Sequence, residues 1–340
     1  MLRKVLVPLD GSPFAEQALP LALTVARRAS ARLHLVSVRV SLQLDALAPT
    51  LEDYLNALAD RLEPQLPGRI TRSVLTNERT PIEYPLARST VAEVVARNVA
   101  DVGVDLVIMT THGRSGIPRA WLGSVADSLV RSVPRPILMI RPQDERFSTA
   151  HDADHGLRHI LIPLDGSARA ERVFEYAQQL GEAFEARYTL LRVLSPLLLT
   201  PTTEWNGSFP AVGVPLQHPQ VATEYMDEVV ERMRAVGMEV RAHLIESLAP
   251  GAAIVEFART HGADLIAMST GAAAGVRRLL LGSVADRVVR SSAVPVLVCN
   301  ARTTEATSVA VPAPRLRRRA LPPAIRYPAE SSRQGAEQGG

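Results

Sequence analysis

The sequence predicts an α/β protein of two tandem doubly wound domains, each with a five-stranded parallel sheet flanked by helices. First, the chain repeats itself: VLVPLDGS at 5–12 returns as ILIPLDGS at 160–167, and LGSVADSLVRSVPRPILMI at 122–140 returns as LGSVADRVVRSSAVPVLVC at 281–299. A repeat this long indicates a duplicated globular domain, since solenoid repeats run about 20–50 residues. Second, segments typical of strands and helices alternate. Third, runs such as DLVIM and PILMI are apolar throughout, as strands buried on both faces of a sheet must be.

The order of elements follows from residue spacing in the first copy. Residues 3–8 form a short β-rich run, and 13–29 place apolar residues at helical spacing. The residues that carry this helical spacing are Phe14, Ala18, Leu21, Leu23 and Val25. Strands are expected at 32–40 and 69–75, separated by an amphipathic stretch near 50–65.

Four more elements complete the first copy. They are a helix, an apolar strand, a second helix and a closing strand, at 85–102, 105–109, 124–132 and 136–141. The second copy repeats the scheme over 158–300, with an irregular, Pro-rich segment at 195–219. Five strands with intervening helices predict a doubly wound sheet in each copy.

The repeats divide the chain into two domains, a linker and a tail. The expected boundaries are 1–141 and 158–300 for the domains, 142–157 for the linker and 301–340 for the tail. The tail carries seven Arg and three Glu, so the first 300 residues sum to −1 although the whole chain is +3. It lacks an apolar periodicity that would form a core, and disorder is expected. Its basic residues Arg315, Arg317, Arg318 and Arg319 suit nucleic acid or an acidic partner, but a solvated tail is favoured and no nucleic-acid partner is expected.

Composition points to a cytoplasmic protein without membrane contact. Hydrophobic residues make up 46% of the chain and aromatic residues 4%, so the cores must be aliphatic. The single cysteine, Cys299, excludes an internal disulfide and fits a reducing compartment. Pro8 and Asp10 come too early for the apolar region of a signal peptide, and no apolar run approaches the roughly 18 residues that cross a bilayer.

The motif PLDGS ends the first strand of each copy and is a candidate ligand contact. In a doubly wound sheet, ligands bind at the carboxyl ends of the strands, near the point where the strand order reverses. Asp10 there would hydrogen-bond a ligand hydroxyl or base. Alternatively, Asp10 or Ser12 caps the following helix. Both interpretations stay open at this stage.

The loop THGRSGIPRAWLGSVAD at 111–127 is a candidate phosphate site. Gly123 and Ser124 open a helix, and amides at a helix N-terminus suit an anion. The loop is not a Walker A motif, because GxxxxGK[ST] is absent and Lys4 is the only lysine; GxGxxG is absent as well. Arg114 or Arg119 would supply charge. Taken alone, Gly-Ser before a helix is also an ordinary cap.

Taken together, these motifs resemble the universal stress protein family in a tandem two-domain form. PLDGS, the THGRSG loop, LGSVAD and the closing PILMI strand occur in the family's order, over 2–141 and again over 158–300. The resemblance implies five parallel strands in a Rossmann-like, adenine nucleotide alpha hydrolase-like fold. It also implies ATP, with or without Mg²⁺, bound through a motif G-x2-G-x9-G-[ST].

In the first copy the family motif maps onto Thr110, Gly113, Gly123 and Ser124. The spacing matches, but Thr110 replaces the first glycine. A small hydroxylated residue there can still donate to a phosphate. The resemblance implies the following nucleotide-binding residues for this copy: Pro8, Leu9, Asp10, Val38, Thr110, Gly113, Arg114, Gly123, Ser124 and Val125.

In the second copy the motif maps onto Ser269, Ala272, Gly282 and Ser283, so two glycines are absent. A β-carbon blocks close approach of a phosphate and disfavours a positive φ. We therefore expect one nucleotide site per chain, in the first copy. The corresponding residues of the second copy are Pro163, Leu164, Asp165, Val193, Ser269, Gly282 and Ser283.

Catalysis has little support in the sequence. His112 lies in the candidate phosphate loop, but its counterpart in the second copy is Gly271. A buried, inert thiol is expected for Cys299. The linker residues His151, Asp152, Asp154 and His155 resemble a metal site in composition only, and no metal is expected.

Two functions of different classes remain after this comparison. One is a nucleotide-binding regulatory protein in the stress response; the other is a scaffold module of the same fold without nucleotide. A slow ATP hydrolase is a third, weaker reading. The closing strands 136–141 and 295–300 are expected sheet edges that need partners. Because the family commonly dimerises through this strand, the resemblance implies an intramolecular pseudo-dimer, with a homodimer of chains as a further option.

Overall fold

The computed structural model describes seven segments of the chain, all within one compact unit, Met1–Val309. The described residues are 1–39, 50–76, 90–111, 122–141, 156–196, 219–270 and 281–300. Several predicted features lie outside them: most of the linker, the tail, the start of the helix expected at 85–102, and most of the Pro-rich segment at 195–219.

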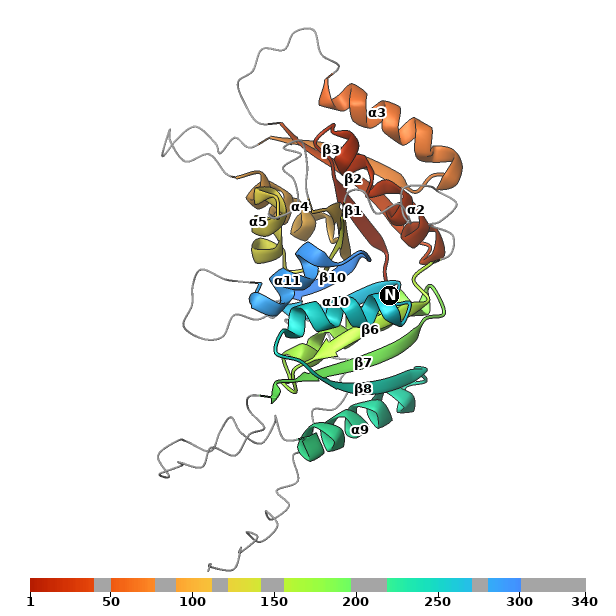
Figure 1. Ribbon diagram of the computed structural model, residues 1–340. Helices are drawn as coiled ribbons and strands as arrows, with labels where there is room; N and C mark the ends of the chain where they lie inside the picture. The colour runs from red at the N-terminus through yellow and green to blue at the C-terminus, as the bar shows by residue number, and fades with distance from the viewer. Residues whose placement is uncertain are drawn as a thin grey trace, which may run out of the picture. The chain divides into compact units, whose positions relative to one another are not determined.

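The elements of both copies follow the predicted order (Figure 1). Those of the first copy are β1 (Lys4–Pro8), α1 (Pro13–Glu16), α2 (Leu19–Arg28), β2 (Arg32–Arg39), α3 (Leu51–Leu62), β3 (Ile70–Thr76), α4 (Val91–Val102), β4 (Leu106–Thr110), α5 (Ser124–Ser132) and β5 (Ile137–Ile140). Those of the second are β6 (His159–Leu164), α8 (Val173–Glu182), β7 (Arg187–Leu194), α9 (Pro219–Ala235), β8 (Val240–Glu246), α10 (Pro250–Thr260), β9 (Leu265–Thr270), α11 (Ser283–Ser291) and β10 (Val296–Asn300). Short 3₁₀ turns follow α3 at Glu63–Gln65 and precede α8 at Ala170–Arg172.

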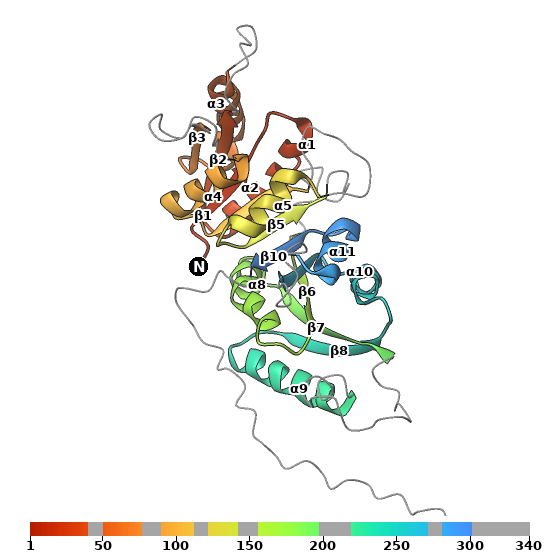
Figure 2. The same ribbon diagram turned by 90° about the vertical axis from the view of Figure 1, so that its left-hand side faces the viewer.

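The ten strands form one sheet in the order β3-β2-β1-β4-β5-β10-β9-β6-β7-β8. Within each copy all pairings are parallel, which confirms the predicted doubly wound architecture. The copies meet at β5 and β10, which pair antiparallel, with Leu297 opposite Leu138 (Figure 2). At the end of β10, the side-chain amide of Asn300 donates to the main-chain carbonyls of Val130 and Arg131 in the first copy, at 3.3 and 3.2 Å. The sheet therefore continues from one copy into the other.

Helices cover both faces of the sheet, and each face has its own apolar core. Successive residues of β1 show the alternation, since Val5 and Val7 belong to one core and Leu6 to the other. The first core contains residues of α1, α2, α3, α8 and α9, and the second contains residues of α4, α5, α10 and α11. Both cores include residues of both copies, and aliphatic side chains predominate in them, as the composition predicts.

Local sequence signals fix the ends of several helices. Thr50 and Thr90 each begin a capping box, because the side chains of Asp53 and Glu93 return a hydrogen bond to the capping residue. Gly103 ends α4 in the left-handed conformation at φ 68°, where a residue without a β-carbon carries no strain.

The single helix predicted at 13–29 is wrong in one respect. The segment forms α1 and then α2, interrupted at Gln17 and Ala18. Pro20, in the first turn of α2, has no amide hydrogen for the carbonyl of Glu16, and its ring crowds that carbonyl. The helical hydrogen bonds are therefore interrupted after α1 and begin again in α2.

None of the helices in the described segments combines the length and the hydrophobicity that a membrane span requires.

Candidate functional site

Predicted site residues of the first copy that the structure describes lie at the carboxyl ends of three neighbouring strands. β1 lies between β2 and β4 in the sheet. The chain runs outward from β1 through β2 to β3, and then returns to place β4 on the other side of β1, so the strand order reverses between β1 and β4. Pro8 ends β1, Val38 lies near the end of β2, and Thr110 ends β4. This is the position at which doubly wound sheets bind ligands.

The PLDGS turn uses both of its polar side chains internally. The Ser12 amide donates to Asp10 Oδ1 at 2.9 Å, and Gly11 takes a φ of 79° between them. Ser12 is the helix cap, because its Oγ accepts from the amide of Ala15 at 3.2 Å. Asp10 therefore braces the turn and Ser12 caps α1. The buried Leu9 fixes the turn to β2 by donating its amide to the carbonyl of Val36 at 2.7 Å.

The second copy repeats this turn closely. The amide and Oγ of Ser167 both donate to Asp165 Oδ1, at 2.9 and 2.5 Å, and Gly166 has a φ of 81°. Leu164 is buried at the end of β6, Pro163 is half-buried and Asp165 is exposed. Val193 lies near the end of β7, as Val38 lies near the end of β2.

The start of α5 lies against the end of β4. The buried Thr111 donates its amide to the carbonyl of Ile140 at 2.9 Å and accepts from the amide of Gly123 at 2.9 Å. Gly123 caps α5 without a side-chain hydrogen bond, and Ser124 and Val125 after it are exposed. The first turn of α5 thus begins at the edge where β1 and β4 end, with Ser124 and Val125 exposed. Gly113, Arg114, Arg119 and His112 lie outside the described residues.

The corresponding elements of the second copy differ in backbone and contacts. Gly282 caps α11 at a φ of 74°, whereas Gly123 has a φ of −57°. Ser283 is exposed like Ser124. Ser269 Oγ is buried and makes no hydrogen bond within the described part of the chain. Ala272 lies outside that part.

A further difference between the copies was not predicted. In the first copy, Ser37 Oγ donates to the carbonyl of Leu9 at 2.8 Å. In the second copy, Arg192 Nη1 donates to the carbonyl of Leu164 at 3.2 Å, and the residue is 3% exposed. Burial lowers the pKa of Arg192, while Asp165 acts in the opposite direction. Aligning SVR at 37–39 with RVL at 192–194 would have revealed the change from serine to arginine.

Each copy also contains a triad of tyrosine, glutamate and arginine beside the PLDGS turn. In the first, Tyr54 Oη donates to Glu16 Oε1 at 3.0 Å, and Arg61 Nη2 lies 2.6 Å from Glu16 Oε2. Burial and then Glu16 raise the pKa of Tyr54, and the carboxylate of Asp10 adds to this effect. The triad therefore ties α3 to α1 within electrostatic range of Asp10.

The second triad is more deeply buried. Tyr225 Oη donates to Glu171 Oε1 at 2.9 Å, and Arg232 Nη2 lies 2.8 Å from Glu171 Oε2. The side chains of Arg232 and Glu171 are 12% and 11% exposed, against 62% and 28% for Arg61 and Glu16. Burial, then Glu171, raises the pKa of Tyr225, and Asp165 adds to the effect.

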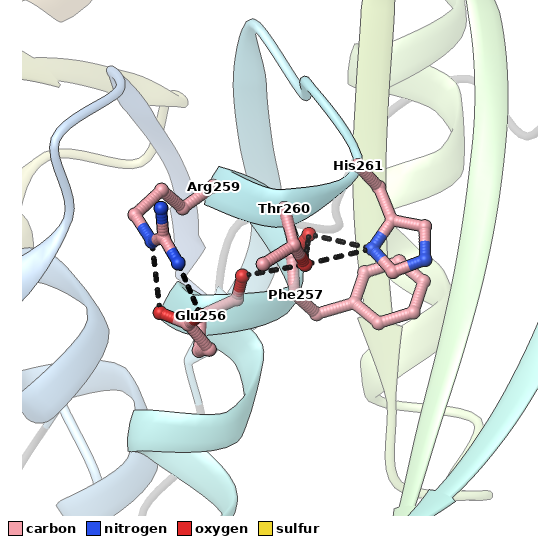
Figure 3. Close-up of polar contacts among 5 residues, drawn as sticks. All are labelled: Glu256, Phe257, Arg259, Thr260 and His261. Atoms are coloured by element: carbon pink, nitrogen blue, oxygen red, sulfur yellow. Dashed lines mark hydrogen bonds and ion pairs between the residues drawn. The ribbon is translucent and has the colours of Figure 1, made fainter.

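The aromatic and histidine cluster at the end of α10 lies away from this edge. The rings of Phe257 and His261 stack with centroids 3.7 Å apart, and His261 Nδ1 lies 3.0 Å from Thr260 Oγ1 (Figure 3). Burial, and then His261, lowers the pKa of His243 on β8. Because the end of α10 leads into the start of β9, the cluster lies at the amino ends of the strands, opposite the candidate site.

Two further predictions concern side chains outside the candidate nucleotide site. Cys299 is buried in β10, and burial raises the pKa of its thiol, which agrees with an inert side chain. Across the described segments, no group of three or more His, Cys, Asp or Glu side chains is placed to hold a metal ion. The linker residues His151, Asp152, Asp154 and His155 lie outside these segments.

Comparison with known proteins identifies the family. The model of the universal stress protein family matches residues 1–141 and 156–300. A universal stress protein of Methanocaldococcus jannaschii is 31% identical over 153 residues, covering 44% of this chain and 86% of the relative. A universal stress protein of Synechocystis is 22% identical over 317 residues, covering 87% of this chain and 99% of the relative.

Solved structures agree on the fold. The crystal structure of a universal stress protein from Archaeoglobus fulgidus superposes with a TM-score of 0.57 at 18% identity, covering 88% of this chain and 98% of that chain. Because the family model matches both copies, and both copies share the sheet topology and the PLDGS turn, the chain belongs to the universal stress protein family, in its tandem two-domain form.

Proposed function

We propose that the chain is an adenine-nucleotide-binding regulatory protein of the stress response, with its nucleotide site in the first copy. The observation that carries the proposal is the start of α5, where the N-cap is Gly123, which has no side chain to occupy the amides of the first turn. Its amides lie next to the point of strand reversal because Gly123 donates to Thr111. A phosphate group suits such amides, and the helix dipole favours its negative charge.

The other half of the proposed ligand is a nucleoside at the PLDGS turn. Asp10 is held in position by the amide of Ser12, and a carboxylate at a strand end suits a ribose hydroxyl. Val38 and Pro8 supply half-buried apolar surface beside it. ATP, with or without Mg²⁺, would then extend from this turn toward Ser124.

For the second copy we propose a structural role as the partner in an intramolecular pseudo-dimer. The antiparallel pairing of β5 and β10 supports this, since it covers the closing strand of each copy with the other. Bound nucleotide in the first copy would then stabilise one arrangement of a surface that other proteins recognise.

The matched variants Ser124→Glu and Ser283→Glu test the location of the site. Both serines are the exposed first residues of their helices, where an acidic side chain favours helix formation. Ser124→Glu places a negative charge where the phosphate would lie, and we expect ATP affinity to fall by about tenfold or more. Ser283→Glu should leave ATP affinity unchanged.

Mass spectrometry of the nucleotide that co-purifies with each variant, followed by calorimetric titration with ATP, measures these effects. Equal loss in both variants, or in neither, would contradict the proposed location. The melting temperature of each variant should equal that of the wild type, which shows that a loss of ATP binding does not come from unfolding.

A further inference from the structure

We propose that His243 and His261 form a two-histidine site for a transition metal ion such as Ni²⁺ or Zn²⁺ in the second copy. Imidazole is the side-chain group that binds these metals most often. His243 belongs to β8, which ends the sheet, and His261 follows the last residue of α10. A bound ion would therefore join the edge strand to the helix that covers it, and the site is independent of the proposed nucleotide function.

The two histidine rings lie close enough for one metal ion to bind both. Their centroids are 5.8 Å apart, and their planes are inclined by 58°. Two metal–nitrogen bonds and the radii of the two rings together span at most about 6.5 Å between centroids. Both residues are exposed, so the ion and the waters that complete its coordination can reach the rings.

The hydrogen bonds of His261 fix its ring in the form that binds a metal. Its Nδ1 lies 3.0 Å from the carbonyl oxygen of Phe257 and 3.0 Å from Thr260 Oγ1 (Figure 3). Because a carbonyl only accepts, Nδ1 carries the proton, and Nε2 of the neutral ring carries the lone pair. Metal-binding histidines usually donate their other N–H in this way. The stack of the ring on Phe257 at 3.7 Å holds the same orientation.

The other ring nitrogens of the pair are available to a ligand. Within the segments that the structure describes, His261 Nε2 and the ring nitrogens of His243 make no hydrogen bond. Burial, then the charges of His261 and Arg241, lowers the pKa of His243, so its ring keeps a lone pair at neutral pH. The charge of Arg241 also opposes a bound cation, and the ion must therefore be held by its bonds to nitrogen.

The first copy has no equivalent pair of histidines. Ser73 of β3 occupies the position of His243, because the two residues pair with equivalent residues of β2 and β7. Val102 occupies the position of His261, one residue before the glycine that follows each helix. We therefore expect one such metal site per chain, in the second copy.

Phenylalanine variants of the full chain test the site, because they keep an aromatic ring and remove the nitrogens. If both histidines bind one ion, His243→Phe and His261→Phe should each bind Ni²⁺ about tenfold or more weakly than the wild type. The double variant should bind no more weakly than either single variant, since one lost ligand already removes the shared site. His151→Phe, which removes a histidine from the linker sequence, is the control and should keep the wild-type affinity.

Calorimetric titration with NiCl₂ measures the affinity, and urea denaturation with and without millimolar NiCl₂ measures the effect on folding. Only the folded chain holds the two rings together, so Ni²⁺ should raise the urea midpoint of the wild type and of His151→Phe. It should not raise the midpoint of the three variants at the site.

A folded His243→Phe or His261→Phe protein that keeps the wild-type affinity and the rise in midpoint overturns the proposal. A wild-type midpoint that Ni²⁺ does not raise overturns it as well, because binding elsewhere in the chain would not join β8 to α10. If one variant fails to fold, the other decides.

Discussion

Replacing Glu171 with alanine is expected to destabilise the protein by about 3–5 kcal/mol, the usual cost of removing one partner from a buried ion pair. Glu171 accepts from Tyr225 Oη at 2.9 Å and from Arg232 Nη2 at 2.8 Å. The side chain of Arg232 is only 12% exposed, so its guanidinium would lose the carboxylate of Glu171 where water has little access. The hydroxyl of Tyr225 would lose its acceptor at the same time.

The first copy supplies the control for this prediction. Glu16 makes the same two contacts, with Tyr54 and Arg61, but the side chain of Arg61 is 62% exposed. Water can solvate Arg61 when the carboxylate is removed, and we expect Glu16→Ala to cost about 1 kcal/mol. Urea denaturation measures the free energy of unfolding of both variants. Equal losses would show that burial of the second triad does not determine its contribution to stability.

Replacing Gly181 with alanine is expected to destabilise the protein by about 1–3 kcal/mol through overpacking. A Cβ at this position of α8 would lie 2.0 Å from Tyr188 Oη and 2.7 Å from its Cζ. Tyr188 is 4% exposed, so its ring has little room to move away. In an open helical position the same change would stabilise by up to about 1 kcal/mol, because alanine has the higher helix propensity. A fall rather than a rise in the free energy of unfolding would therefore indicate the contact between the new Cβ and Tyr188.

A second substitution should reverse this loss. The first copy has Ala26 and Leu33 at the positions of Gly181 and Tyr188. We therefore expect Tyr188→Leu to recover much of the stability of Gly181→Ala, since a leucine has no ring to meet the new Cβ. Chemical denaturation of the two single variants and the double variant gives the coupling energy. A Gly181→Ala protein as stable as wild type would contradict the packing described for α8 and β7.

The fold could be read from the sequence because its signals are local. The apolar run at β4 and the helical spacing of α3 each lie within one short segment. The repeat then supplied a second, independent reading of the same elements. The break between α1 and α2 was also a local signal, carried by Pro20, but the apolar spacing on both sides concealed it.

The residues around the site were only partly predictable. Ser12 and Asp10 were found as a pair, and the structure separates them into a cap and a brace of the turn. The triads were missed because Glu171 lies 54 residues from Tyr225 and 61 from Arg232, and no local pattern connects them. Arg192 was missed because a charged residue inside a strand pattern resembles an exposed position until its neighbours are known.

We expect one chain to hold one adenine nucleotide, in the first copy. Calorimetric titration of ATP into the wild-type full chain, stripped of co-purified nucleotide, tests it directly. The expected result is one site per chain, with ATP affinity reduced about tenfold or more in Ser124→Glu and unchanged in Ser283→Glu. Two equal ATP sites per chain, or one site whose ATP affinity is unchanged in Ser124→Glu, would contradict this expectation.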